Sequence, residues 1–568
     1  MNSTGSPRVL ILGAGINGCA VARELALNGA AVCMVEAHDI AAGATARSSR
    51  LIHGGLRYLE YGDFQLVRES LVERNRLLAL APQFVQPLRL FIPLRGRASG
   101  VLRSALAFCG ASRTSVGQWL AKNGPGTRER GLWLVSLGLG LYDLFARGGG
   151  QPPHSVHRLG ERGVPRVDAQ RYRWLTAYTD AQMLYPERFV LALLDDARQL
   201  AQEQGTAFEL FTRRRAVFTG RRVEVLPFNQ AAAAGYAFEP EVVVNATGAW
   251  GDLTLQELGV SAPRLFGGTR GSHFITRHAG LMAALGDAGI YAEAADGRLV
   301  FILPFGDAVL VGTTDEEFQE RPECAVATPA ELDYLIGMVN DVFGGLSLTR
   351  GDVALHYSGV RPLPFVPGGS AAAITRGHAI VRHECGAAPV FTLVGGKLTT
   401  CRAFAEQVAD RVLEVLHLPR TGSSRERPIP GAPTGDFALR ARRLGLSEPM
   451  QAAVWSLCGD RLDDIFATPV QAAGAVLWGT QIPLEFVRWS IRREWVASLE
   501  DLVERRLMLV YHEELSDGVL RQLAEELCAA GLLTADQVAA AVAQEIERLA
   551  RIYGKVVMRS DVGSAGGT

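Results

Sequence analysis

The fold is decided by residues 8–58, whose sequence is RVLILGAGINGCAVARELALNGAAVCMVEAHDIAAGATARSSRLIHGGLRY. A short apolar run opens this stretch and leads into a G-x-G-x-x-G pattern made by Gly13, Gly15 and Gly18. A helical pattern follows, and a second apolar run ends at Glu36. A strand, a glycine turn, a helix and a second strand in this order are typical of a Rossmann-type unit that binds a dinucleotide.

Each part of this unit has a physical role. Gly13 permits a tight turn, Gly15 lets a pyrophosphate approach the backbone, and Gly18 lets the helix pack on the strand. The helix N-terminus, where Asn17 lies, offers unpaired N–H groups and a partial positive charge to phosphates. Glu36, 18 residues beyond Gly18, is placed to accept hydrogen bonds from ribose hydroxyls and would repel a 2′-phosphate. The unit predicts a bound ADP moiety and disfavours NADP, but it does not separate NAD from FAD.

The residues that follow Glu36 favour FAD. A nicotinamide-binding Rossmann domain normally continues into another regular helix and strand, whereas here a run of small residues, 41–46, comes next. Extended backbone of this kind can lie along a long buried cofactor. The stretch ends in Arg57 and Tyr58, side chains suited to binding an anion. We predict that this stretch contacts FAD through Ser48, Ser49, His53, Gly54 and Gly55.

The segment 48–60, SSRLIHGGLRYLE, resembles the signature of the FAD-dependent glycerol-3-phosphate dehydrogenases, which belong to the D-amino-acid-oxidase-like flavoproteins. Arg50 stands where the typical family form has lysine, and Ala44 and Ala46 stand where it has serine. The first difference keeps the charge, and the other two keep the small size. Three later motifs resemble the same family, so that the resemblance runs from residue 8 to about 415: GTTD at 312–315, YSGVRP at 357–362 and GGKLTT at 395–400. A further motif, NATG at 245–248, resembles one of the wider flavoprotein superfamily.

Two of these motifs predict further cofactor contacts. The apolar strand 242–244 runs into small residues that let backbone pass close to the cofactor, so we assign Ala246, Thr247 and Gly248 to the FAD site. In GGKLTT, a Gly-Gly turn precedes a helix predicted over 398–417, whose N-terminus would stabilise negative charge on a reduced flavin. The contacts predicted there are Gly396, Lys397, Leu398 and Thr399.

Length and composition limit the remaining possibilities. A chain of 568 residues with 48% hydrophobic and 21% charged residues is expected to fold into two or three globular domains. Its net charge of −1 gives no basic excess for binding nucleic acid. The 8 cysteines form no C-x-x-C pair, so we expect no metal and no disulfide framework, as in a reducing cytoplasm. The short polar N-terminus predicts no secretory signal. The apolar run 131–146 is too short to span a membrane, and a buried helix is favoured over an interfacial one.

The predicted fold is α/β: a discontinuous Rossmann-type FAD-binding domain, a mixed-sheet substrate domain and an all-α C-terminal domain. Residues 88–93, which end in a proline, predict an edge strand. The predicted boundaries are 8–94, 186–265 and 352–417 for the FAD-binding domain, 95–185 and 266–351 for the substrate domain, 418–436 for a linker, 437–558 for the helical domain and 559–568 for a flexible tail.

The resemblance implies a substrate and a set of side chains for it. The substrate would be sn-glycerol 3-phosphate, whose dianion needs cationic partners. We predict that the phosphate is bound by Arg57, Tyr58, Arg361 and Lys397. His53 and His273 are both candidates for the base that takes the proton of the C2 hydroxyl, because imidazole titrates nearest physiological pH. We slightly favour His273, and either histidine is equally suited to orienting the flavin.

The implied reaction is hydride transfer from C2 to flavin N5, which yields dihydroxyacetone phosphate. The family resemblance further implies a membrane quinone as electron acceptor and peripheral attachment to the inner face of the membrane from the cytoplasm. A homodimer is one arrangement we expect. An oxidase that uses oxygen, an amino-acid oxidase of the same superfamily and a non-catalytic dinucleotide-binding module are the alternatives, in order of decreasing support.

Overall fold

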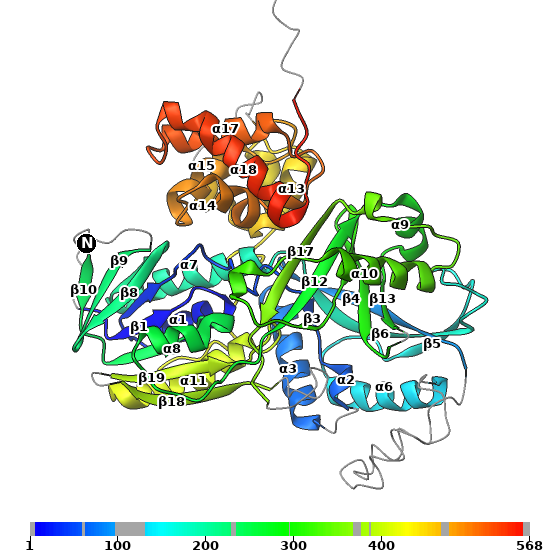
Figure 1. The fold of residues 1–568 in the computed structure, drawn as a ribbon, viewed down its shortest axis with the longest axis horizontal. Helices are drawn as coiled ribbons and strands as arrows, with labels where there is room; N and C mark the ends of the chain where they lie inside the picture. The colour runs from blue at the N-terminus through cyan, green and yellow to red at the C-terminus, as the bar shows by residue number, and fades with distance from the viewer. Residues whose placement is uncertain are drawn as a thin grey trace, which may run out of the picture.

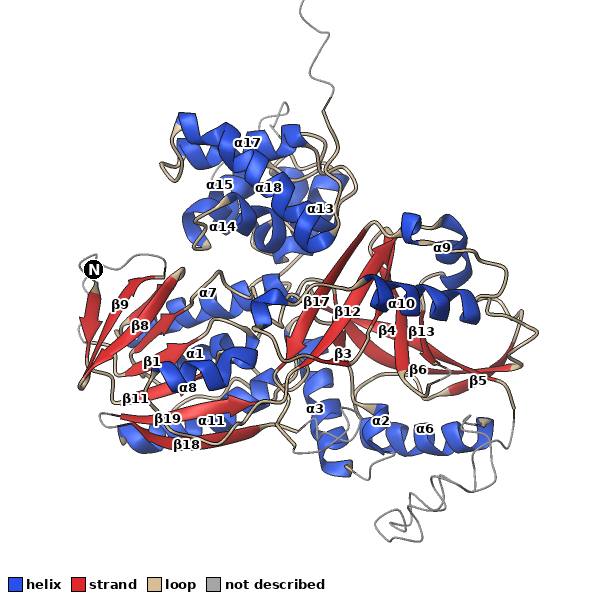
Figure 2. Ribbon diagram, viewed as in Figure 1, coloured by secondary structure: helices blue, strands red, loops and turns tan. Residues whose placement is uncertain are grey.

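The computed structural model describes residues 6–59, 63–96, 131–228, 235–294, 296–366, 377–385, 388–466 and 476–560 (Figure 1). Two large sheets lie side by side, and a helical domain sits across both of them. Figure 2 shows helices and loops in this upper part, whereas the two lower parts combine strands with helices. The predicted α/β class with a Rossmann-type FAD-binding domain and a helical C-terminal domain is confirmed.

The first sheet has the strand order β18-β19-β11-β1-β2-β7 and is parallel apart from the β18–β19 pair. Its strands are β1 (Val9–Leu12), β2 (Val32–Val35), β7 (Phe208–Phe211), β11 (Val242–Asn245), β18 (Ala379–Cys385) and β19 (Ala388–Val394). The helices on one face are α1 (Ile16–Leu27), α7 (Pro186–Gln204) and α11 (Cys401–Leu416). The opposite face is covered by α8 (Gly251–Glu257) and a small sheet of β8 (Arg214–Thr219), β9 (Arg222–Pro227) and β10 (Tyr236–Phe238).

The alternation of side chains in β1 explains why this sheet is buried on both faces. Val9 and Ile11 pack with the helices α1, α7 and α11, whereas Leu10 and Leu12 pack with β9 and α8 on the other side. All four residues are buried. A strand buried on both faces reads as a continuous apolar run, which is the pattern of VLIL.

The second sheet has the order β16-β12-β15-β14-β13-β4-β6-β3, with β17 paired to β12 and β5 paired to β6. Its strands are β3 (Leu51–Ile52), β4 (Val85–Leu94), β5 (Ser155–Arg158), β6 (Trp174–Met183), β12 (Thr269–Thr276), β13 (Gly289–Glu293), β14 (Leu299–Phe305), β15 (Ala308–Gly312), β16 (Glu316–Glu317) and β17 (Leu355–Arg361). The helices beside it are α2 (Leu56–Leu59), α3 (Phe64–Leu80), α6 (Leu132–Ala146), α9 (Ala279–Leu285) and α10 (Pro329–Val342).

Two predictions about these elements were wrong, one about β4 and one about α6. The strand β4 lies inside the second sheet, between β13 and β6, and not at an edge. It pairs with β13 only at Leu90 and Phe91, so that Pro87 and Pro93 need no donor on that side. Both β4 and β17, whose residues are within the ranges predicted for the FAD-binding domain, pair with strands of the second sheet. The helix α6 leaves one apolar face exposed and is not fully buried. The domain boundaries themselves stay predictions.

The C-terminal domain is built on one apolar core that includes Val487, Leu502, Leu520 and Leu549. Its elements are α12 (Phe437–Arg443), α13 (Glu448–Cys458), α14 (Leu462–Ile465), α15 (Leu484–Arg493), α16 (Leu499–Asp501), a π-helix (Leu502–Arg506), α17 (Asp517–Ala529) and α18 (Val538–Tyr553). Among the described residues, the helices are all too short or too polar to cross a membrane.

Candidate active site

The glycine turn between β1 and α1 is packed against the NATG motif. Gly13 has a φ of +99°, and a Cβ added to it would lie 2.7 Å from the backbone oxygen of Ala246. A Cβ on Gly18 would lie 2.1 Å from the oxygen of Gly13. Only glycine fits either position, so the turn, the start of α1 and the end of β11 form a backbone-lined cradle. A cradle of this kind fits the pyrophosphate of FAD.

Glu36 closes one side of this cradle. Its Oε2 accepts a hydrogen bond of 2.7 Å from the N–H of Ala14, and its Oε1 accepts one of 2.8 Å from the N–H of His38. Burial raises the pKa of the Glu36 carboxyl, and the two N–H groups oppose that shift. The carboxylate is therefore fixed beside the glycine turn, where the sequence predicts a ribose.

Residues 39–50, which we call the cofactor segment, link the cradle to the second sheet. At the cradle, the Thr45 hydroxyl accepts a hydrogen bond of 3.0 Å from the N–H of Ile16. At the sheet, the Ser49 hydroxyl is 2.8 Å from Nε2 of His273, and the oxygen of Ser48 accepts a hydrogen bond of 2.9 Å from the Tyr357 hydroxyl. Ser48 and Ser49, both predicted FAD contacts, thus lie between the dinucleotide cradle and the predicted base.

A second group of predicted residues meets where the chain leaves β3. The N–H of His53 donates to the Thr399 hydroxyl over 3.1 Å. The Nζ of Lys397 lies 3.9 Å from the centre of the Tyr58 ring. Asn17 reaches the same place, because its Nδ2 donates to the oxygen of Gly395 over 3.5 Å. The structure therefore brings together segments 53–58 and 395–399, which are more than 330 residues apart in the chain.

Two details of this region differ from the sequence predictions. The helix after GGKLTT begins at Cys401 and not at Leu398, because Leu398 to Thr400 form a turn after two glycines of positive φ. Gly396 has a φ of +97°, which other residues rarely adopt, and a Cβ added to it would lie 2.5 Å from Nδ2 of Asn17. The side chain of Arg57, predicted to bind phosphate, lies outside the described residues.

His273 lies in β12 and is buried. Its ring stacks on Tyr357, with 4.9 Å between the ring centres, and its Nδ1 has no hydrogen-bond partner among the described residues. Burial, reinforced by the charges of Arg361 and Arg50, lowers the pKa of His273 well below its usual value. The imidazole is therefore neutral at physiological pH, which is the state that a proton acceptor requires.

Arg361, at the end of β17, is held in place by the GTTD motif, and its charge acts on His273. One terminal nitrogen donates to Asp315 over 2.8 Å, and the other donates to the Thr313 hydroxyl over 2.9 Å. The guanidinium lies over Gly271, where any Cβ would come within 2.2 Å of it. Because Gly271 is two residues from His273, the absence of a side chain there lets the cation approach the imidazole. Both terminal nitrogens face protein acceptors, so an anion would have to share this guanidinium with them.

Glu331, at the start of α10, is a residue that sequence reasoning missed. It is buried, and its Oε1 accepts hydrogen bonds of 2.8 Å from the hydroxyls of Ser272 and Thr314. The Ser272 hydroxyl is also 2.6 Å from that of Ser358. Ser272 precedes His273, Thr314 precedes the Asp315 that binds Arg361, and Ser358 follows the Tyr357 that stacks on His273. Glu331 therefore fixes the strands that carry the candidate base. A capping-box pattern, Thr328 to Glu331, was its one local signal.

Arg50 is a second missed residue. The sequence suggested only a lysine-to-arginine change, but the side chain is fully buried and its fork binds Glu187 with two hydrogen bonds, of 2.8 and 3.1 Å. It also donates to the hydroxyl of Tyr511 over 2.6 Å. Lysine has no planar fork and could not make this set of contacts. Neither partner is near Arg50 in the sequence, so no local pattern could have revealed them.

The comparisons with known proteins agree with the cradle and its surroundings. Residues 8–411 match the family model described as FAD dependent oxidoreductase, so the chain is an FAD-dependent oxidoreductase. It is 33% identical to a glycerol-3-phosphate dehydrogenase of a Synechocystis species over 76% of this chain and 74% of that protein. It is 31% identical to a D-erythritol 1-phosphate dehydrogenase of Brucella abortus over 89% of this chain and 94% of that protein.

A crystal structure has the same fold along almost the whole chain. It is the glycerol-3-phosphate dehydrogenase from Bacillus halodurans complexed with FAD, with a TM-score of 0.68, 19% sequence identity, and coverage of 97% of this chain and 96% of that one. The chain belongs to the family of FAD-dependent glycerol-3-phosphate dehydrogenases. The resemblance stated from SSRLIHGGLRYLE is confirmed, and so is FAD as the cofactor.

Proposed function

We propose that this protein oxidises the C2 hydroxyl of sn-glycerol 3-phosphate to give dihydroxyacetone phosphate. The observation that carries the proposal is a neutral, buried His273 beside the cofactor segment, with the cation of Arg361 near enough to help lower the pKa of His273. A proton acceptor and an anion-binding group are the two functions that oxidation of a phosphorylated alcohol requires from the chain itself. When bound, FAD supplies the hydride acceptor.

The residues proposed to hold FAD form three groups. The pyrophosphate is assigned to the glycine turn and the start of α1, and the ribose of the adenosine to Glu36. The remaining contacts come from the cofactor segment, the residues after β3, the NATG motif and the GGKLTT turn. Together they are Gly13, Gly15, Asn17, Gly18, Glu36, Ser48, Ser49, His53, Gly54, Gly55, Ala246, Thr247, Gly248, Gly396, Lys397, Leu398 and Thr399.

For the substrate, we assign the phosphate to Lys397, Tyr58, Arg57 and Arg361. The pairing of Lys397 with the Tyr58 ring supports this assignment, because it places a cation at the junction of two cofactor-binding segments. His273 is assigned the proton of the C2 hydroxyl. His53 is the alternative base, since its N–H is anchored to Thr399 and its ring lies 6.3 Å from that of Tyr58.

A D-erythritol 1-phosphate is the second candidate substrate. The D-erythritol 1-phosphate dehydrogenase of Brucella abortus aligns over 94% of its own length, and the alignment includes part of the C-terminal domain of this chain. Its identity to this chain, 31%, is close to the 33% of the Synechocystis glycerol-3-phosphate dehydrogenase. The two substrates share a phosphate and a secondary hydroxyl but differ by one carbon. The groups assigned above would serve either of them, so only a direct comparison of the two compounds decides.

We propose a membrane quinone as electron acceptor and peripheral attachment to the inner face of the membrane. The exposed face of α6 supports this, because Trp133, Leu137 and Leu144 are 65%, 63% and 47% exposed on one helix. Large apolar side chains on one helical face suit an interfacial contact with lipid. Oxygen is the alternative acceptor, and a homodimer is the assembly we propose.

The proposed function is tested by mixing purified protein with each substrate in the absence of air. Both compounds should bleach the flavin absorbance. The ratio of the bleaching rate constant to the dissociation constant should be higher for glycerol 3-phosphate than for D-erythritol 1-phosphate. A reversed order would favour the second candidate, and bleaching by neither would refute both. Reoxidation by quinone in liposomes or by dissolved oxygen then identifies the acceptor. Replacement of His273 or His53 by asparagine identifies the base, because only the loss of the base should slow bleaching strongly.

A further inference from the structure

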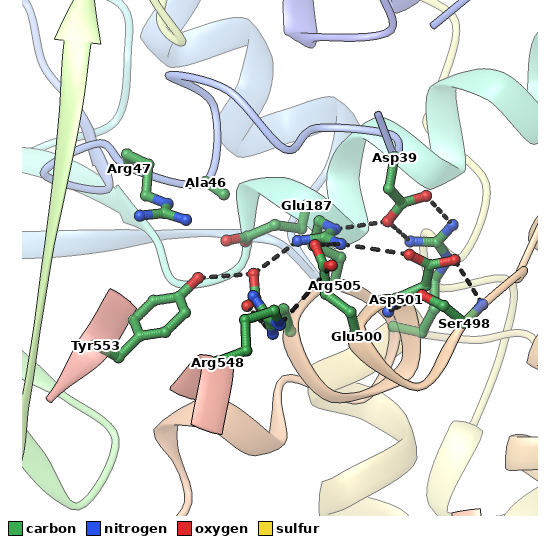
Figure 3. A network of polar contacts seen from close by, with 12 residues as sticks. Asp39, Ala46, Arg47, Glu187, Ser498, Glu500, Asp501, Arg505, Arg548 and Tyr553 are labelled. Atoms are coloured by element: carbon green, nitrogen blue, oxygen red, sulfur yellow. Dashed lines mark hydrogen bonds and ion pairs between the residues drawn. The ribbon is translucent and has the colours of Figure 1, made fainter. Parts of the chain in front are cut away.

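The C-terminal helical domain contacts the cofactor segment on the side opposite to the glycine turn and His273. Asp39, at its start, accepts hydrogen bonds from Arg505 over 2.5 Å and from Arg506 over 2.7 and 2.8 Å. All three side chains are buried. Figure 3 shows Asp39 and Arg505 within one network of dashed contacts that also includes residues of the C-terminal domain. A buried carboxylate with two arginines is a strong link, because removal of either partner leaves a buried charge without its counter-ion.

The two arginines are themselves fixed in place. They lie in a π-helix, Leu502–Arg506, a rare element that is often found at functional sites. Arg505 also donates to the carboxylate of Glu504 over 2.6 Å, and Arg506 donates to the backbone oxygen of Glu494 over 2.9 Å. Both guanidinium groups are therefore held toward the same carboxylate, and little conformational freedom is left to lose on binding it.

Two further contacts hold the other end of the cofactor segment. The Arg47 guanidinium lies 4.9 Å from the centre of the Tyr553 ring, which belongs to the last helix of the domain. The Tyr553 hydroxyl donates in turn to Glu504 over 2.7 Å. The hydroxyl of Tyr511 is 2.6 Å from a terminal nitrogen of Arg50.

These contacts matter because the cofactor segment has little regular structure of its own. No residue from 39 to 50 lies in a helix or a strand. Its opposite side touches the glycine turn through Thr45 and the candidate base through Ser49. A segment outside regular helices and strands populates many conformations unless other parts of the protein restrict it.

We propose that the C-terminal domain positions the cofactor segment, and that Asp39, Arg505, Arg506 and Tyr511 are positioning residues for FAD. If FAD binds only when the segment has one particular conformation, the apparent affinity for FAD is the intrinsic affinity multiplied by the fraction of molecules in that conformation. The domain raises this fraction without touching the cofactor. The proposal rests on the assignment of FAD and not on the proposed substrate, and its test uses no substrate.

The test compares two carboxylate variants of the full-length holoenzyme. Asp39→Asn weakens the link to the cofactor segment. Asp460→Asn is the matched control, because the Asp460 side chain is also buried and binds an arginine, Arg440, but the partners of its carboxylate all lie between residues 434 and 440. Release of FAD is followed after dilution by the rise in flavin fluorescence, and circular dichroism reports whether each variant is folded.

Asp39→Asn should release FAD at least about tenfold faster than the unmodified protein, and Asp460→Asn should stay within about threefold of it. Equal release from the two variants, or release from Asp39→Asn within threefold of the unmodified protein, would overturn the proposal. If Asp39→Asn does not fold, Tyr511→Phe decides, because it removes one hydroxyl and keeps the ring, which lies 5.2 Å from that of Phe305. This variant should release FAD about three- to tenfold faster, and an unchanged rate would refute the proposal.

Discussion

Replacement of Glu331 by glutamine is expected to loosen the strands that carry His273. The carboxylate accepts hydrogen bonds from the hydroxyls of Ser272 and Thr314, each 2.8 Å long, and pairs with Arg270 over 2.8 Å. A hydrogen bond to a charged group contributes about 1.5–3 kcal/mol, and one between neutral groups about 0.5–1.5 kcal/mol. Each of the three contacts should therefore lose about 1 kcal/mol, or about 3 kcal/mol in total.

Native-state hydrogen exchange measures this change locally. A loss of about 3 kcal/mol corresponds to exchange about 100-fold faster for the amides of β12 and β17. The control is Asp333→Asn on the same helix, because Asp333 forms an ion pair with Arg350 in which both side chains are more than half exposed. Exposed ion pairs contribute little, so exchange in this control should change by less than about fivefold. Exchange in Glu331→Gln that is no faster than in the control would refute the role given to Glu331.

Three further predictions concern the cofactor, the base and the phosphate. Gly18→Ala should yield protein without flavin absorbance, because the new Cβ would lie 2.1 Å from the oxygen of Gly13; a normal flavin content would contradict the described turn. Because burial and the charges of Arg361 and Arg50 lower the pKa of His273 well below 6.5, its imidazole should stay neutral as the pH falls through 6.5. The rate of flavin reduction should therefore decline only below that pH, and a half-maximal rate at pH 6.5 would exclude this base. The unfolded chain gains a proton below pH 6.5 that the folded protein does not, so this residue should also lower stability as the pH falls. Arg361→Ala should raise the KM for glycerol 3-phosphate about 10- to 150-fold with FAD still bound. Steady-state kinetics with a flavin assay would show this, and an unchanged KM would remove Arg361 from the site.

The Rossmann-type unit could be predicted because its determinants are local. Gly18 is required by the oxygen of Gly13, five residues away, and Gly13 has a positive φ that favours glycine whatever lies around it. The continuous apolar runs of β1 and β2 are visible in each strand alone. The same holds for the family motifs, each of which is a short run. Glu36 could be found as well, since its distance from the turn is set by one helix and one strand.

The position of β4 could not be predicted, because its neighbours β6 and β13 come from distant parts of the chain. Its prolines suggested an edge, but the short overlap with β13 removes the need for the donors that proline lacks. Arg50 illustrates the same limit for the site. Its partner Glu187 is 137 residues away, so the sequence showed a positive charge and nothing of what binds it.

The central claim is that this chain binds FAD and reduces it with a phosphorylated alcohol held by its own cations. The most direct measurement compares the rate of flavin bleaching by glycerol 3-phosphate with that by glycerol, without air and at equal concentration. The claim predicts rapid bleaching by the phosphate ester and a rate at least about tenfold lower with glycerol, since a lost charge-assisted contact lowers binding by at least that factor. Equal rates with the two compounds, or no bleaching by glycerol 3-phosphate, would contradict it.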